Sequence, residues 1–194
     1  EVTKDIAPGN YEIELRLKKE GDVVTSAKQR LTVIGVELPK QKIMHTEWMH
    51  ADCLADYYHV DVFSEEHWKI LENYFKEYVK RGCNMMLTPL FTSPLDTAVG
   101  LERTTTQLIK VEVVKGEYRF EFSELKRWID LCKKCGIEYY EMSHLFSQWG
   151  AKYAPKVVAE VDGKEEKIFG WHTQAVGEYT RFLKAFLPQL IEKL

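Results

Sequence analysis

The chain has 194 residues, of which 45% are hydrophobic and 29% are charged, an ordinary composition for a soluble globular protein. Its formal net charge of -3 excludes an electrostatic case for binding nucleic acid or an anionic membrane surface. No apolar run reaches the roughly 18 residues of a membrane span. We therefore expect neither nucleic acid nor a membrane as a partner.

The first stretch of the chain predicts a β-hairpin. Apolar and charged residues alternate over residues 11–18, which is the period of a half-buried strand. Gly21-Asp22 is the expected turn, and residues 23–36 are the returning strand. Two strands are not stable alone in water, so we expect residues 1–38 to be the C-terminal strands of a β-sandwich domain. Pro39 then marks a domain boundary.

Beyond this boundary, short apolar strands alternate with amphipathic helices. The predicted strands cover residues 42–48, 84–88 and 137–145. Long loops follow these strands, and two of the loops contain further hairpins, with turns at Lys115-Gly116 and Asp162-Gly163.

Three helices are predicted between and after these strands. Ser64 and Ser123 are placed as N-caps of the first two helices, and Gly82 and Gly136 as the residues that end them. The last helix fills the C-terminal residues, and Pro188 is expected to kink or divide it.

This alternation predicts an α/β fold with parallel strands. Short helix-to-strand links and long strand-to-helix loops are typical of a (β/α)₈ TIM barrel, whose active site is built from the loops after the strands. An open doubly wound sheet is the rival, although the first loop lacks the GxGxxG motif of nucleotide sites. Because a complete barrel needs about 250 residues, we expect residues 39–194 to be its incomplete N-terminal part. Its open edge is expected to favour self-association.

The loop after the first predicted strand is the densest polar cluster of the chain. Carboxylates accept hydrogen bonds from vicinal sugar hydroxyls, and aromatic rings pack on the apolar face of a sugar ring. A second reading makes His45, Glu47, His50 and Asp52 metal ligands, although their spacing matches neither HExxH nor HxH. A third leaves these residues as loop caps. The candidates for a sugar site in this region are His45, Glu47, Trp48, Asp52 and Asp56.

The two later loops add three candidates. Asp96 lies in the loop from Pro89 to Leu108, which is long enough to suggest a binding loop. His144 and Trp149 follow the third predicted strand, where a histidine or a tryptophan can serve a sugar site or the core.

The cysteines predict no redox or metal site. Cys132 and Cys135 form a CxxC motif, but it ends a helix and has no second ligand pair. Few and scattered cysteines favour a reducing compartment such as the cytoplasm, and a secreted location stays open.

Three long segments carry a resemblance to a known family. They are HTEWMHADCLADYYHVDVFSEEHW, GCNMMLTPLFTSPLDTAVGLERTTTQL and HLFSQWGAKYAPKV. They resemble the front of the catalytic domain of glycoside hydrolase family 123 and its uncharacterised relatives, over about residues 40–194. The resemblance implies a β-sandwich domain that leads into a (β/α)₈ barrel.

The activity implied by the resemblance is that of a retaining β-N-acetylgalactosaminidase. In this family the 2-acetamido carbonyl of the substrate is the nucleophile, while an adjacent Asp-Glu pair orients that group and supplies the general acid. The family places this pair on the fourth strand, so the catalytic residues are expected beyond Leu194 and the segment alone is expected to be inactive.

The residues of this chain are then expected to form the wall of a sugar pocket. The implied partner is a glycan that contains N-acetylhexosamine, with no metal and no other cofactor. The alternatives are a carbohydrate-binding barrel without catalysis and a metal-dependent hydrolase that uses the cluster from His45 to Asp52. The proposed wall residues are His45, Glu47, Trp48, Asp52, Asp56, Asp96, His144 and Trp149.

Overall fold

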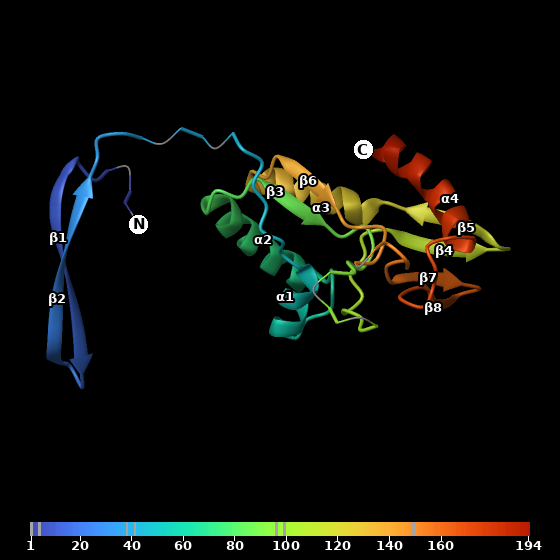
Figure 1. Ribbon diagram of the computed structural model, residues 1–194, viewed down its shortest axis with the longest axis horizontal. Coiled ribbons are helices and arrows are strands. Elements are labelled where there is room, and N and C mark those ends of the chain that lie inside the picture. Colours follow the sequence, from blue (N-terminus) through green and yellow to red (C-terminus); the bar gives the residue numbers. More distant parts are fainter. Residues whose placement is uncertain are drawn as a thin grey trace. The chain divides into compact units, whose positions relative to one another are not determined.

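The computed structural model describes residues 2–3, 5–37, 39–40, 42–95, 97–98, 100–148 and 150–194 (Figure 1). The chain divides into two compact units, Glu1–Lys42 and Ile43–Leu194, and each unit is described by itself.

The first unit is the expected antiparallel hairpin. β1 (Gly9–Lys19) pairs with β2 (Asp22–Val33) over nearly its whole length. The turn lies one residue earlier than predicted, because Asp22 already pairs with Lys19, and Glu20 and Gly21 take up the positive φ angles of 53° and 98°. Leu15 and Leu17 are more than 60% exposed, and nearly all other residues of the two strands are exposed as well.

The centre of the second unit is a pair of parallel strands with helices packed against it. β3 (Met85–Thr88) pairs in parallel with β6 (Tyr139–Met142). α2 (Glu65–Lys80) and α3 (Ser123–Cys135) lie side by side (Figure 1) and bury an aromatic core in which the rings of Phe75 and Trp128 are 5.0 Å apart. Two parallel strands with α3 in the connection between them confirm the predicted α/β pattern.

Residues 42–48 do not form the predicted strand. The side chain of Asn84 replaces part of the ladder: its Oδ1 accepts from the backbone N–H of His45 at 2.8 Å, and its Nδ2 donates to the carbonyl of Ile43 at 3.1 Å. The N–H groups of Asn84 and Met85 both donate to the carbonyl of His45. The segment therefore lies beside the start of β3 without a regular ladder.

A short helix, α1 (Ala51–Tyr58), occupies the region predicted as a polar loop. Ala51 and Leu54 are buried in the same core cluster as Trp68 and Leu71 of α2. Packing on α2 thus stabilises a helix that is too short and too polar to stand out in the sequence.

The helix ends follow the sequence signals with one exception. Ser64 caps α2 by accepting from the N–H of His67 at 3.2 Å, and Gly136 ends α3 in the left-handed region with φ of 96°. Ser123 is the first residue of α3 rather than its cap, because Glu121 accepts from both the N–H and the hydroxyl of Ser123 at 2.7 Å.

The two predicted hairpins join into one mixed sheet. β4 (Lys110–Val114) and β5 (Glu117–Glu121) form the first hairpin, and β7 (Val157–Val161) and β8 (Lys164–Phe169) form the second. β4 pairs in parallel with β7, which gives the strand order β5-β4-β7-β8. The sequence placed these hairpins in separate loops and did not predict that they pair.

α4 (Glu178–Lys193) packs on this sheet as one helix (Figure 1). Phe182 and Phe186 are fully buried, and their rings lie within 5.5 Å of Phe91 and Phe120. The helix runs through Pro188, so the predicted division there is wrong.

The described residues thus form a mixed α/β chain with open sheets, and no barrel closes among them. In the same residues, no helix has the length and apolar character needed to cross a membrane.

Candidate functional site

The carboxyl ends of β3 and β6 are held together by buried hydroxyl residues. The N–H of Ser143 donates to the carbonyl of Thr88 at 2.9 Å, and its Oγ donates to the carbonyl of Phe91 at 3.4 Å. Both Thr88 and Ser143 are at most 2% exposed. These bonds fix where the chain leaves the sheet, so the following loops start from a rigid base.

Trp48, Glu141 and His144 meet at this end of the sheet. The indole Nε1–H of Trp48 donates to Oε2 of Glu141 at 3.0 Å. The ring of Trp48 meets that of His144 edge to face, with centroids 5.6 Å apart. Trp48 keeps 45% of its surface exposed. An indole with a fixed orientation and an exposed surface suits the apolar face of a sugar ring.

His45 and Glu47 lie on the same segment but beside the start of β3. Nε2 of His45 is 3.3 Å from Oε1 of Glu47, and its Nδ1 is 3.9 Å from Sγ of Cys83. Burial, with the nearby Glu47 carboxylate, raises the pKa of the Cys83 thiol, so this sulfur stays protonated at neutral pH. Glu47 itself is largely exposed and free to turn toward solvent.

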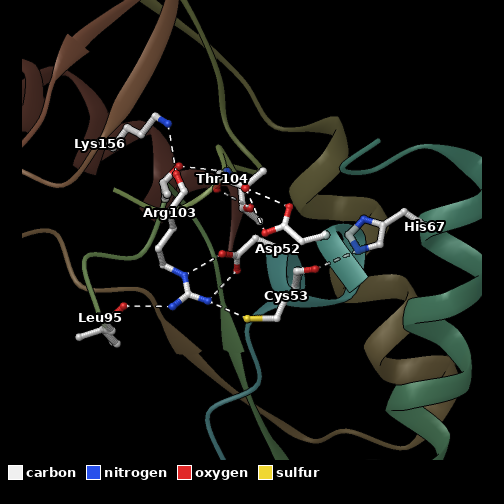
Figure 2. A network of polar contacts seen from close by, with 11 residues as sticks. Asp52, Cys53, His67, Leu95, Arg103, Thr104 and Lys156 are labelled. Atoms are coloured by element: carbon white, nitrogen blue, oxygen red, sulfur yellow. Dashed lines mark hydrogen bonds and ion pairs between the residues drawn. The ribbon is translucent and has the colours of Figure 1, made fainter. Parts of the chain in front are cut away.

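Asp52 forms a buried ion pair with Arg103 (Figure 2). Nε of Arg103 donates to one carboxylate oxygen at 2.7 Å and Nη2 to the other at 3.2 Å. Both side chains are less than 10% exposed. Burial alone would lower the pKa of Arg103, but the Asp52 carboxylate outweighs it and holds that pKa above its usual value. Both oxygens of Asp52 are therefore engaged within the protein.

Asp56 is engaged from the same loop. The hydroxyl of Thr104 lies 3.0 Å and 3.1 Å from the two oxygens of Asp56, so its single proton is shared between them. Asp56 is exposed, and its carboxylate keeps capacity to accept further hydrogen bonds.

His67, which no sequence pattern singles out, holds the start of α1. Its Nδ1 accepts from the N–H of Phe63 at 2.9 Å, so the ring proton is on Nε2, which donates to the carbonyl of Ala51 at 3.1 Å. Burial lowers the pKa of His67 and keeps the ring neutral. The base of α1 is thus held by a buried, uncharged imidazole.

A narrow hollow opens between the start of α1 and the loop after β3. Ser93, which is 7% exposed, lies in its wall, and its Oγ has no hydrogen-bond partner among the described residues. The other wall residues include Met49, His50, Asp52, Pro89 and Arg103.

Two predicted wall residues, Asp96 and Trp149, lie outside the described residues. Among the residues that the structure describes, no group of three or more His, Cys, Asp or Glu side chains could hold a metal ion. The four ligands of the metal reading do not form such a group, and both carboxylate oxygens of Asp52 are bound by Arg103.

The sequence missed two residues that the geometry makes prominent. Glu141 is a half-buried carboxylate inside the strand motif Tyr139–Met142, and that unusual position was the signal available. Arg103 was visible only as a charge in a long loop, and no local pattern pairs it with Asp52, which lies 51 residues away.

Polar and aromatic side chains gather where the parallel strands end, which is where α/β folds commonly bind their ligands. The family model described as "Glycoside hydrolase 123, catalytic domain" matches residues 48–194. The chain therefore belongs to glycoside hydrolase family 123, as its segments predicted, and it is glycoside hydrolase-like.

A solved relative has the same fold over this chain. It is a family 123 glycoside hydrolase from Clostridium perfringens, whose structural analysis concerned the hydrolysis of glycolipid glycans. The TM-score is 0.67 at 21% sequence identity, and the match covers 98% of this chain but 35% of the other. The chain thus spans about a third of that relative. No curated protein matches the chain.

Proposed function

We propose that the protein containing this chain is a retaining β-N-acetylgalactosaminidase that acts on the end of a glycan. Family membership supports this proposal, as does the study of glycolipid glycan hydrolysis on its relative. Within the chain, the observation that carries it is the Trp48 indole, held by Glu141 and His144 at the carboxyl end of the parallel strands.

The proposed reaction uses the substrate as its own nucleophile. The carbonyl oxygen of the 2-acetamido group attacks the anomeric carbon while the glycosidic bond breaks and a carboxylic acid protonates the leaving oxygen. Water then opens the cyclic intermediate from the opposite face, and the original configuration returns. By family resemblance, the Asp-Glu pair of this reaction belongs to a fourth strand, so no residue of this chain is assigned as the acid.

In this proposal the described residues form one wall of the sugar pocket. The segment 42–48, β3 and β6 correspond to the first three strands of a (β/α)₈ barrel, after a β-sandwich that ends within residues 1–38. Trp48 packs on the sugar ring, while Glu141 and His144 hold the indole and face the sugar hydroxyls. Asp52 acts through Arg103, and His45, Glu47, Asp56, Asp96 and Trp149 remain proposed wall residues.

Substitutions of Trp48 test this proposal in the full natural protein. Kinetics are measured with para-nitrophenyl N-acetyl-β-galactosaminide for Trp48→Ala and Trp48→Phe. Loss of a stacking ring worth about 1–3 kcal/mol lowers kcat/KM about fivefold to about 150-fold in the alanine variant. The Trp48→Phe variant keeps an aromatic ring and should retain most of the wild-type kcat/KM. Equal kcat/KM in all three proteins would remove Trp48 from the site.

The same assay separates the alternative of a binding barrel without catalysis. That alternative expects wild-type protein to bind N-acetylgalactosamine, by calorimetry, without releasing nitrophenol. A metal-dependent hydrolase would instead lose its turnover when dialysed against a chelator, whereas substrate-assisted hydrolysis keeps it.

A further inference from the structure

Three consecutive residues in the loop after β3 connect two parts of the fold, α1 and β8. Arg103 forms the buried bidentate pair with Asp52, in the first turn of α1. Thr104 donates to Asp56, one turn further along the same helix. Glu102 faces the opposite way, and its Oε1 accepts from Nζ of Lys167 in β8 at 2.7 Å.

The loop after β3 also makes several contacts with the β7–β8 hairpin. Nζ of Lys156, just before β7, donates to the carbonyl of Arg103 at 3.2 Å and is 3.9 Å from Glu102 (Figure 2). An antiparallel bridge joins Thr92 to Lys156. The loop is thus attached to the hairpin by charge, by a side chain and by backbone.

Gly170, directly after β8, adds a steric observation. A Cβ atom at this position would lie 3.1 Å from Oε1 of Glu102 and 3.4 Å from Cε1 of His172. Its φ is not in the left-handed region, so the conformation does not require glycine. The Glu102 carboxylate occupies the space beside Gly170, so a side chain at position 170 would press on that carboxylate.

We propose that residues 102–104 form a positioning clasp that sets where α1 lies relative to the loop after β3 and the β7–β8 hairpin. Asp52 is four residues from Trp48, so the clasp also fixes the Trp48 side of the sugar pocket. This second part rests on the proposed function. Arg103 and Glu102 are positioning residues, because their charges are engaged by protein groups rather than aimed at a ligand.

Two substitutions loosen the clasp at its far end without touching α1. Gly170→Ala crowds Glu102 and keeps every charge, whereas Glu102→Gln keeps the shape and removes one charge. Asp130→Asn is the matched control, because it breaks an exposed ion pair with Lys126 at 2.6 Å on α3, away from the clasp. All are made in the full natural protein.

Hydrogen exchange reads the clasp without any sugar. Residues in one hydrogen-bond network have interaction energies of roughly 0.5–3 kcal/mol, so weakening the clasp should make local opening of α1 easier. Amide exchange at residues 51–58 should therefore be about tenfold faster in both clasp variants. The amides of α3 should not change, and Asp130→Asn should leave α1 as in the wild type. Unchanged α1 exchange in both clasp variants would overturn the clasp.

Kinetics with para-nitrophenyl N-acetyl-β-galactosaminide then test its role in the site. Misplacing a ring that binds substrate and transition state alike raises KM and leaves kcat nearly constant, so KM should rise several-fold in both clasp variants. Faster α1 exchange with an unchanged KM would overturn the link to the sugar pocket. If the wild type neither binds nor cleaves the glycoside, the proposed function fails, while the exchange data still decide the clasp.

Discussion

Asp52→Asn and Glu65→Gln make the same chemical change in two bidentate pairs, yet they should differ widely in effect. Asp52 contacts Arg103 at 2.7 Å and 3.2 Å, and Glu65 contacts Arg127 at 2.7 Å and 2.8 Å. The Asp52 side chain is 8% exposed, whereas that of Glu65 is 76% exposed. The two pairs have similar contact distances and differ mainly in burial.

The expected cost follows from the charge left behind. Asp52→Asn leaves the guanidinium of Arg103 buried without a counter-charge, which should lower the free energy of unfolding by about 3–5 kcal/mol. Glu65→Gln should shift the unfolding midpoint very little, because water solvates the released Arg127. The double variant Asp52→Leu/Arg103→Met removes both buried charges and should recover most of the loss, apart from about 1 kcal/mol for the carbonyl of Leu95.

Urea unfolding followed by tryptophan fluorescence measures these differences in the full natural protein. The Asp52→Asn midpoint should fall well below those of the wild type and Glu65→Gln, with the double variant between them. Similar midpoints for Asp52→Asn and Glu65→Gln, or a double variant no more stable than Asp52→Asn, would refute the reasoning that burial makes this pair strong.

Three further variants test other parts of the account. Burial depresses the pKa of His67, so the unfolded state binds the extra proton first and the free energy of unfolding should fall as pH drops below the usual histidine pKa of about 6.5. In His67→Gln this dependence on pH, measured from urea midpoints, should be weaker. An unchanged dependence would point to another titrating group. Asn84→Ala removes two hydrogen bonds that anchor residues 43–45 and should cost about 2 kcal/mol, with faster exchange in that segment; no change would mean the anchor lies elsewhere. Gly136→Ala places a side chain at φ of 96° and should cost about 1 kcal/mol by thermal unfolding, and a neutral result would contradict the strained C-cap.

Turn residues and helix-capping residues predicted where hairpins turn and where helices begin and end. The hairpin turns at Lys115-Gly116 and Asp162-Gly163, the Ser64 cap and the Gly136 end all appear where residue chemistry requires them. These features depend on neighbours in the chain, so pattern and conformation agree.

The errors arose where distant residues decide the outcome. Residues 42–48 read as a short strand, but the Asn84 side chain makes hydrogen bonds that a neighbouring strand would otherwise make. α1 is stabilised by packing on α2 rather than by propensity, and the pairing of β4 with β7 joins segments some fifty residues apart.

The site was predicted in outline rather than in its contacts. Trp48 and His144 were selected from separate loops, and the structure brings them together. Asp52 was selected as a sugar ligand, whereas its oxygens bind Arg103, a partner that no spacing rule identifies. The sequence does not select Glu141, because both faces of its strand carry mixed polar and apolar residues and the inward face is not evident.

We propose above all that the full natural protein is a hydrolase in which the acetamido group of the substrate assists the reaction. The most direct measurement compares kcat/KM for para-nitrophenyl N-acetyl-β-galactosaminide and para-nitrophenyl β-galactoside, which differ only in that group. The substrate-assisted mechanism predicts turnover of the N-acetyl-β-galactosaminide alone, because the β-galactoside lacks the nucleophile. Comparable turnover of both glycosides would contradict it.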